Sequence, residues 1–231
     1  MTNTSAGLGA LAGGVVVSCQ AGADSPLHSP MMIAALAASA ERGGAVGFRV
    51  DGVADITAVR ATTALPIIGI NKEPHEGFDV FITPTVKSAV DAAMAGSQIV
   101  AVDGTARPRP GGESFADIVH ALHKLNVEVM ADIATVDEGM AALDAGADIA
   151  ATTLAGYTQD STDKNGPAFD VLAGIVSRGG RVIVEGRIWT IEDVAHCFEL
   201  GAFAVVIGSA VTVPEFITRR FVAAAERAVL R

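Results

Sequence analysis

The chain has 231 residues, half of them hydrophobic, and a formal net charge of −10 at pH 7. This length supplies one full-sized hydrophobic core, and β/α barrels of about this size fold as one domain. The negative charge argues against nucleic-acid binding, which needs a basic surface, and the apolar residues include no run near the roughly 18 that a membrane span requires.

The two cysteines predict free thiols in a cytoplasmic protein. Cys19 and Cys197 lie far apart, and neither belongs to a metal-ligand spacing. The letters V-V-S-C that end at Cys19 resemble a lipoprotein cleavage box. A signal peptide begins with a basic region, however, and the first lysine or arginine of the chain is Arg42. We therefore reject the signal-peptide interpretation.

The order of elements follows from apolar periodicity. Residues 1–13 are mostly small or polar and predict a flexible N-terminal segment, and we expect residues 14–231 to form the catalytic domain. Apolar runs rich in valine and isoleucine predict strands at residues 14–20, 45–49, 66–70, 99–102, 128–131, 149–153, 181–187 and 203–210. Helical spacing predicts helices at residues 30–42, 54–63, 84–96, 114–124, 136–145, 169–177, 191–198 and 213–230. A short additional strand is predicted at residues 78–83, and loops at residues 107–112 and 156–166.

This alternation predicts a single-domain α/β fold, the (β/α)8 TIM barrel. A helix end, a glycine and an apolar strand recur at Gly44, Gly96, Gly146 and Gly201, roughly fifty residues apart, which is two βα units each time. The main alternative is a doubly wound open sheet. That fold carries a G-x-G-x-x-G turn after its first strand, and S-C-Q-A-G-A does not match it.

Polar residues end nearly every predicted strand. In a β/α barrel the carboxyl ends of the strands meet at one mouth, which holds the active site. A purely structural barrel gives no reason for this pattern. The candidate residues are Gln20, Arg49, Lys72, Asp103, Asp132, Thr152 or Thr153, Glu185 and Ser209.

Lys72 is the best candidate for a general base. It follows the buried run P-I-I-G-I-N, so its amine reaches the mouth near Arg49. Glu185 is either a second acid or base or the counter-ion of Lys72. Arg49 lies in the apolar run V-G-F-R-V, and its guanidinium suits binding of an anion or a carbonyl in a fixed, forked geometry. Asp103 binds a sugar hydroxyl or forms a salt bridge with a nearby arginine; both interpretations stay open.

Two glycine turns predict a phosphate site. Gly186 with Arg187 and Gly208 with Ser209 follow the seventh and eighth predicted strands. Glycine lets backbone N–H groups approach an anion closely, and the last two strand ends are the usual phosphate site of such barrels. The alternative is that these glycines only form ordinary turns after the strands. The histidines form no cluster with metal-ligand spacing, so we expect no metal.

Eight motifs, in order along about residues 14–221, resemble the N-acetylmannosamine-6-phosphate 2-epimerase family. They are S-C-Q at 18–20, G-F-R at 47–49, P-I-I-G-I-N-K at 66–72, I-T-P-T at 82–85, A-V-D-G-T-A-R-P-R-P at 101–110, A-D-I-A-T at 131–135, T-T-L-A-G-Y-T at 152–158 and E-G-R-I at 185–188. The resemblance implies a cofactor-independent barrel that inverts C2 of a sugar phosphate in amino-sugar and sialic-acid catabolism.

The resemblance also implies residue roles. It places the catalytic base on Lys72 and its partner on Glu185. It places substrate contacts on Gln20, Arg49 and Asp132, to which we add Thr153, and the phosphate on Gly186, Arg187, Gly208 and Ser209. Two positions depart from the family pattern, because Glu73 and Val213 stand where the family often has arginine.

Three functions are weighed. The first is the epimerase, in which Lys72 removes and returns the C2 proton and Glu185 assists ring opening or acts as the opposite-face acid. The second is a Schiff-base aldolase with Lys72 as nucleophile, and the third is a non-catalytic sugar-phosphate sensor. The apolar last helix fits either packing on the barrel or the face of a homodimer.

Overall fold

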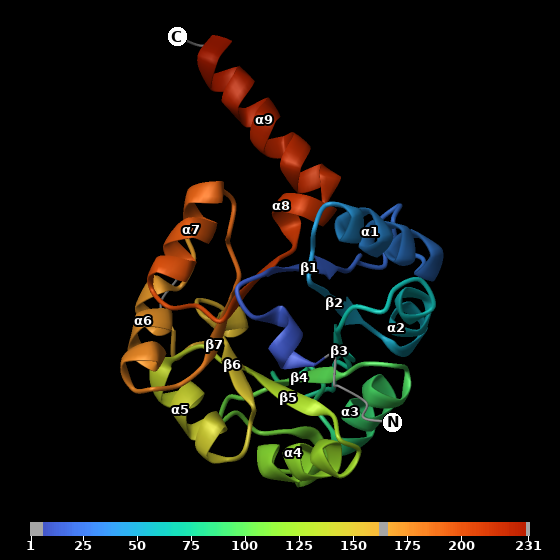
Figure 1. The fold of residues 1–231 in the computed structure, drawn as a ribbon, viewed down its shortest axis with the longest axis vertical. Helices are drawn as coiled ribbons and strands as arrows, with labels where there is room; N and C mark the ends of the chain where they lie inside the picture. Colours follow the sequence, from blue (N-terminus) through green and yellow to red (C-terminus); the bar gives the residue numbers. More distant parts are fainter. Residues whose placement is uncertain (1–6, 162–165, 230–231) are drawn as a thin grey trace.

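The computed structural model of the protein describes residues 7–161 and 166–229. Eight parallel strands pair in chain order, and the eighth pairs with the first, so the sheet closes into a barrel (Figure 1). The strands are β1 (Val15–Cys19), β2 (Gly47–Asp51), β3 (Ile67–Ile70), β4 (Ile99–Asp103), β5 (Glu128–Asp132), β6 (Ile149–Ala151), β7 (Val182–Glu185) and β8 (Ala204–Ile207). The predicted single-domain (β/α)8 TIM barrel is confirmed.

Helices surround the barrel and connect its strands (Figure 1). The α-helices are α1 (Pro30–Arg42), α2 (Val53–Arg60), α3 (Val86–Met94), α4 (Phe115–Lys124), α5 (Val136–Asp144), α6 (Phe169–Ser177), α7 (Ile191–Glu199), α8 (Ser209–Thr212) and α9 (Pro214–Val229). The described residues also form three 3-10 helices, namely η1 (Leu8–Leu11), η2 (Pro110–Gly112) and η3 (Thr152–Leu154).

Four of the connecting helices begin at the same kind of cap. Thr85, Ser114, Thr135 and Thr190 each accept a hydrogen bond from the backbone three residues ahead, and the side chain there bonds back to the cap. Such reciprocal capping boxes satisfy two backbone N–H groups that would otherwise lack partners. Each cap contributes about 1 kcal/mol, and together they fix where helices α3, α4, α5 and α7 begin.

The N-terminal segment is not flexible where the structure describes it. Leu8 and Leu11 are buried in η1 and belong to the core cluster inside the barrel, with Ile99 and Met130. The backbone N–H of Leu8 donates to the Glu128 carboxylate at 2.7 Å. The expectation of a flexible segment is therefore wrong for residues 7–13, because these leucines close one end of the barrel; residues 1–6 lie outside the described residues.

Two other expectations also need correction. Residues 78–83 form no strand; the only pairing there among the described residues is an isolated bridge between Lys72 and Ile82. The eighth strand ends at Ile207, and residues 209 and 210, which were predicted to belong to it, instead begin the short helix α8. The last predicted helix corresponds to α9, which begins at Pro214 because Val213 does not have helical dihedral angles. Its predicted end at Leu230 lies outside the described residues, as do residues 162–165 of the long loop.

Helix α9 does not pack on the barrel. None of its described residues is buried, and Figure 1 shows it extending away from the strands. The outside of β1 next to α1 and α8 is left with a hollow of about 450 Å³, lined by apolar side chains that include Val15, Val17, Leu36 and Val211. Within the described residues, no helix is long and apolar enough to cross a membrane.

Candidate active site

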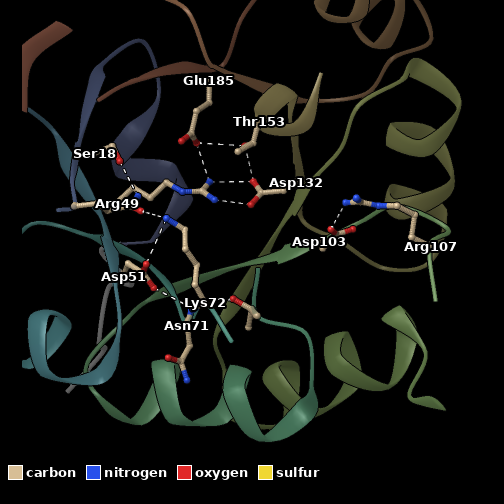
Figure 2. Close-up of polar contacts among 12 residues, drawn as sticks. Ser18, Arg49, Asp51, Asn71, Lys72, Asp103, Arg107, Asp132, Thr153 and Glu185 are labelled. Carbon is tan, nitrogen blue, oxygen red and sulfur yellow. Dashed lines mark hydrogen bonds and ion pairs between the residues drawn. The ribbon is translucent and has the colours of Figure 1, made fainter. Parts of the chain in front are cut away.

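A buried arginine joins three strands at the barrel mouth. Arg49 of β2 forms a bidentate contact with Asp132 of β5, with Nη1–Oδ1 and Nη2–Oδ2 distances of 2.9 and 2.5 Å. Its Nη1 also donates to Glu185 Oε2 of β7 at 2.8 Å. Figure 2 shows the two carboxylates and the guanidinium meeting in one cluster. The predicted meeting of these three strand ends is confirmed.

The charged groups of this cluster interact strongly because they are buried. The side chains of Arg49 and Asp132 are 1% and 0% exposed. Burial alone would lower the pKa of Arg49, but the neighbouring carboxylates of Asp132 and Glu185 more than offset it and leave this pKa raised. The guanidinium therefore stays charged and keeps a fixed orientation at the mouth.

Glu185 is the titratable group of the cluster. Burial raises its pKa to about 7; Arg49 opposes this rise, while the nearby charge of Asp132 adds to it. The Thr153 hydroxyl donates to Asp132 at 2.6 Å and contacts Glu185 Oε2 at 3.3 Å. The Thr152 hydroxyl instead bonds the Glu185 backbone. Of the two threonines, Thr153 thus contacts the carboxylates of the cluster, and Thr152 contacts the backbone at the end of β7.

Lys72 lies two residues beyond the end of β3, with its amine at the same mouth. Its Nζ donates to Gln20 Oε1 at 2.5 Å, and Gln20 in turn donates to the Ser18 hydroxyl at 2.8 Å. The Lys72 side chain is 36% exposed, and its Nζ lies 3.4 Å from Asp51 Oδ2. The carboxylate that contacts this amine is thus Asp51, which the sequence reasoning did not select; Glu185 instead contacts Arg49.

A cavity of about 420 Å³ opens beside these groups. Its lining residues are Ser18, Gln20, Tyr157, Glu185, Gly186, Arg187, Ile188, Trp189, Val206, Ile207, Gly208, Ser209, Thr212, Val213 and Phe216. Both predicted glycine turns therefore border the same cavity as Glu185 and Gln20. The predicted phosphate site therefore borders the same cavity as Glu185, one of the two predicted catalytic residues.

The two turns differ in how they are built. Gly186 and Arg187 both have positive φ, 103° and 56°, a backbone conformation that glycine adopts without strain. The Arg187 guanidinium donates to the carbonyl of Ala155 at 2.8 Å and stacks on Tyr157 at 4.2 Å. Gly208 precedes α8, whose first N–H groups have no partner within the helix.

Other candidates from the sequence have structural roles. Asp103 pairs with Arg107 at 2.7 Å and accepts from Thr105, so the salt-bridge interpretation of Asp103 is confirmed. Among the described residues there is no group of three histidine, cysteine or acidic side chains arranged to hold a metal. Cys19 and Cys197 are buried free thiols, and burial raises the pKa of each.

Fold and site together define a single-domain β/α barrel enzyme with an amine, a carboxyl group and an arginine fork at its mouth. A family model described as "putative N-acetylmannosamine-6-phosphate epimerase" matches residues 33–227. The chain therefore belongs to this family, as its motifs indicated, and is a carbohydrate epimerase of the isomerase class.

Individual relatives agree. A putative N-acetylmannosamine-6-phosphate 2-epimerase of Caldanaerobacter subterraneus is 41% identical over 92% of this chain and 91% of its own. One of Cutibacterium acnes is 44% identical over 93% and 94%. The solved N-acetylmannosamine-6-phosphate 2-epimerase of Clostridium perfringens superposes with a TM-score of 0.92 at 40% identity, covering 94% and 95%. A thiamine phosphate pyrophosphorylase from Pyrococcus furiosus, with a TM-score of 0.58, 15% identity and 89% coverage of both chains, shares the fold.

Proposed function

We propose that this protein interconverts N-acetylmannosamine 6-phosphate and N-acetylglucosamine 6-phosphate in amino-sugar and sialic-acid catabolism. In the ring-opened sugar, C2 is bonded to the C1 aldehyde. Removing the C2 proton gives an enolate, and returning it to the other face inverts the carbon. The reaction needs a base close to C2 and a positive group at the C1 oxygen, and no electron is gained or lost.

Lys72 and Arg49 supply these two needs. In this mechanism the Lys72 amine accepts the C2 proton while the electron pair of the C–H bond moves toward the C1 oxygen. The Arg49 guanidinium is already charged and fixed by two carboxylates, so it stabilises that oxygen without reorganising. No cofactor is required for this step.

Glu185 supplies the acid of the reaction. Its pKa of about 7 leaves a substantial protonated fraction near neutral pH. A protonated Glu185 assists ring opening or delivers the proton to the opposite face of C2. Because Glu185 lines the cavity, whereas Asp132 is fully buried and makes a bidentate contact with Arg49, the proposal gives Asp132 the role of holding Arg49. The direct sugar contact expected of Asp132 stays a prediction.

The phosphate is placed at the two glycine turns. Four residues of these turns line the cavity, and backbone N–H groups at such turns suit an anion: Gly186, Arg187, Gly208 and Ser209. Gln20 lines the cavity and contacts Lys72, which supports a role in orienting the sugar. Thr153 contributes through the carboxylates of Asp132 and Glu185.

The observation that carries the proposal is the shared mouth. The Lys72 amine and the Glu185 carboxyl lie at the same mouth, and Arg49 contacts Glu185 directly (Figure 2). A base and an acid from different strands thus face one substrate position in a chain of the epimerase family.

The test follows C2 inversion of N-acetylmannosamine 6-phosphate by NMR in heavy water. We expect N-acetylglucosamine 6-phosphate with deuterium at C2, and we expect Lys72→Ala to bind substrate without converting it. A product without deuterium, or full turnover by Lys72→Ala, would contradict the mechanism. Borohydride added with substrate distinguishes the aldolase, which would be trapped covalently at Lys72. Ligand-induced stabilisation of the wild type without turnover would indicate the sensor.

We also propose that the protein forms a homodimer through α9. Ile217 and Phe221 lie on one side of α9, along a groove of about 620 Å³ that also includes Trp189. The hollow beside β1 lies where a barrel of this class normally carries its last helix. A second copy of the chain supplies an apolar helix that matches this hollow. The cytoplasmic location stays a prediction.

A further inference from the structure

Asp51 contacts Lys72 at two points. Its Oδ1 accepts a hydrogen bond from the backbone N–H of Lys72 at 3.0 Å, and its Oδ2 lies 3.4 Å from Lys72 Nζ. Asp51 is the last residue of β2 and pairs with Ile70, two residues before Lys72 on the neighbouring strand. One carboxylate therefore holds both ends of the lysine, its backbone and its amine.

Lys72 needs such support because its own segment gives little. It lies beyond the end of β3, and apart from the bond to Asp51 its backbone pairing among the described residues is an isolated bridge with Ile82. A lysine side chain has four rotatable bonds, and holding it in one arrangement has a large entropic cost. The hydrogen bond to Gln20 restrains the Lys72 amine from one side, and Asp51 restrains it from another. Figure 2 shows the lysine chain running from the Asp51 side toward Arg49.

We propose that Asp51 is a positioning residue that aims the Lys72 amine at the reacting carbon. The inference rests on the proposed function for its kinetic consequence, but the restraint on the lysine is a property of the free protein. Asp51 lies two residues after Arg49 on the same strand, so β2 supplies both the fork for the C1 oxygen and the support for the base. A displaced amine slows proton transfer without weakening the hold on the phosphate, because the cavity residues are unchanged.

Two substitutions separate the two contacts. Asp51→Asn keeps an oxygen for the backbone N–H of Lys72 but removes the charge facing the amine, whereas Asp51→Ala removes both. We expect kcat to fall about 10²-fold in Asp51→Ala, the usual effect of a misplaced reactive group, and less than about tenfold in Asp51→Asn, since a partly exposed ion pair is weak. KM should stay within about threefold in both. Asp55→Asn, a half-buried carboxylate on α2, is the matched control and should keep wild-type kcat.

A second readout does not require turnover. The lysines of the chain are Lys72, Lys87, Lys124 and Lys164, and carbon-13 labelling at their ε position gives a short NMR spectrum in which Lys72→Arg assigns the Lys72 signal. We expect two distinct ε protons for the restrained Lys72 of the wild type, and a single sharp signal in Asp51→Ala. Asp55→Asn should leave the signal unchanged.

The outcomes are separable. A wild type that does not epimerise the sugar phosphate, yet shows a restrained Lys72 that Asp51→Ala releases, overturns the proposed function and keeps the positioning role. Asp51→Ala with an unchanged Lys72 signal, or with wild-type kcat, overturns the positioning role. The positioning role is also overturned if Asp51→Asn and Asp51→Ala show the same fall in kcat and the same loss of melting temperature. That pattern indicates a general structural role.

Discussion

Arg49 and Glu185 come from strands β2 and β7, yet their Nη1 and Oε2 atoms lie 2.8 Å apart inside the barrel mouth. This contact places a permanently charged guanidinium against the carboxyl group whose pKa burial raises to about 7. The same pair thus combines a fixed positive charge with an acid that releases its proton near neutral pH. Replacing either residue should therefore change both the charge of the mouth and the proton affinity of its remaining groups.

The pH dependence of turnover should report Glu185. If the protonated carboxyl is the acid, kcat falls as pH rises through about 7, because the acid form is lost there. Glu185→Gln should be slow at every pH and show no such fall. Steady-state rates between pH 5.5 and 8.5 check this, and a wild-type kcat that stays constant across that range would argue against the role of Glu185 as acid.

The stability of the fold should depend on pH through the same group. The pKa of Glu185 is higher in the folded state, about 7, than its ordinary value of 4.5. As pH rises between these values, the unfolded chain loses the proton first, so this group makes the fold less stable. The melting temperature of wild type relative to Glu185→Gln should therefore decrease from pH 5 to pH 8. A difference that stays level, or increases with pH, would contradict the raised pKa.

Replacing Arg49 should destabilise the protein much more than replacing an exposed arginine. Arg49→Ala leaves the buried carboxylates of Asp132 and Glu185 without their cation, which costs about 3 to 5 kcal/mol. The control is Arg178→Ala, which removes an exposed ion pair with Asp137 at 2.6 Å and should cost at most about 1 kcal/mol. Urea unfolding at pH 7 measures both, and similar losses would mean that burial of the cluster contributes little.

The 3-10 helix η1 should contribute to the core. Leu11 is fully buried at the closed end of the barrel, so Leu11→Ala should leave a cavity and cost about 2 to 5 kcal/mol. Leu125→Ala, at a residue that is 41% exposed, should cost under about 1 kcal/mol. Chemical denaturation compares them. A Leu11→Ala variant as stable as wild type would mean that the segment does not close the barrel in solution.

Helix α9 should determine the oligomeric state. Phe221 is 72% exposed on the apolar side of this helix, so Phe221→Glu should convert a homodimer to a monomer by placing a charge in the interface. Glu226→Gln, on a different side of the same helix, is the control and should leave the dimer intact. Sedimentation equilibrium measures the mass. A wild type that is monomeric at high concentration would contradict the dimer.

The barrel and most of its mouth are predictable from sequence for a physical reason. Strands buried on both faces must be continuous apolar runs, so their polar ends are visible as departures from the run. Closure of the barrel then brings those ends together regardless of their separation along the chain, as it does for Arg49, Asp132 and Glu185. The helix caps are equally local, because each capping box lies within four residues.

The features that sequence reasoning missed depend on long-range packing. Leu8 and Leu11 lie among glycines and alanines, and they become core residues only because the barrel interior receives them. Asp51 was missed because the second strand was expected to end at Arg49, whereas it extends to Asp51 and turns this carboxylate toward Lys72. The apolar residues of α9 fit packing on the barrel or on another chain equally well, and only the structure shows that its own barrel leaves them exposed.

The bonds of Arg49 link β2 to β5 and β7 across the inside of the barrel. The ends of these strands cannot spread without separating buried charges, so the rim of the opening has a fixed width. We therefore expect ligand entry and release to involve the connections above the rim, where the Arg187 guanidinium donates to the carbonyl of Ala155. We expect any change of shape during a catalytic cycle to be confined to this outer layer.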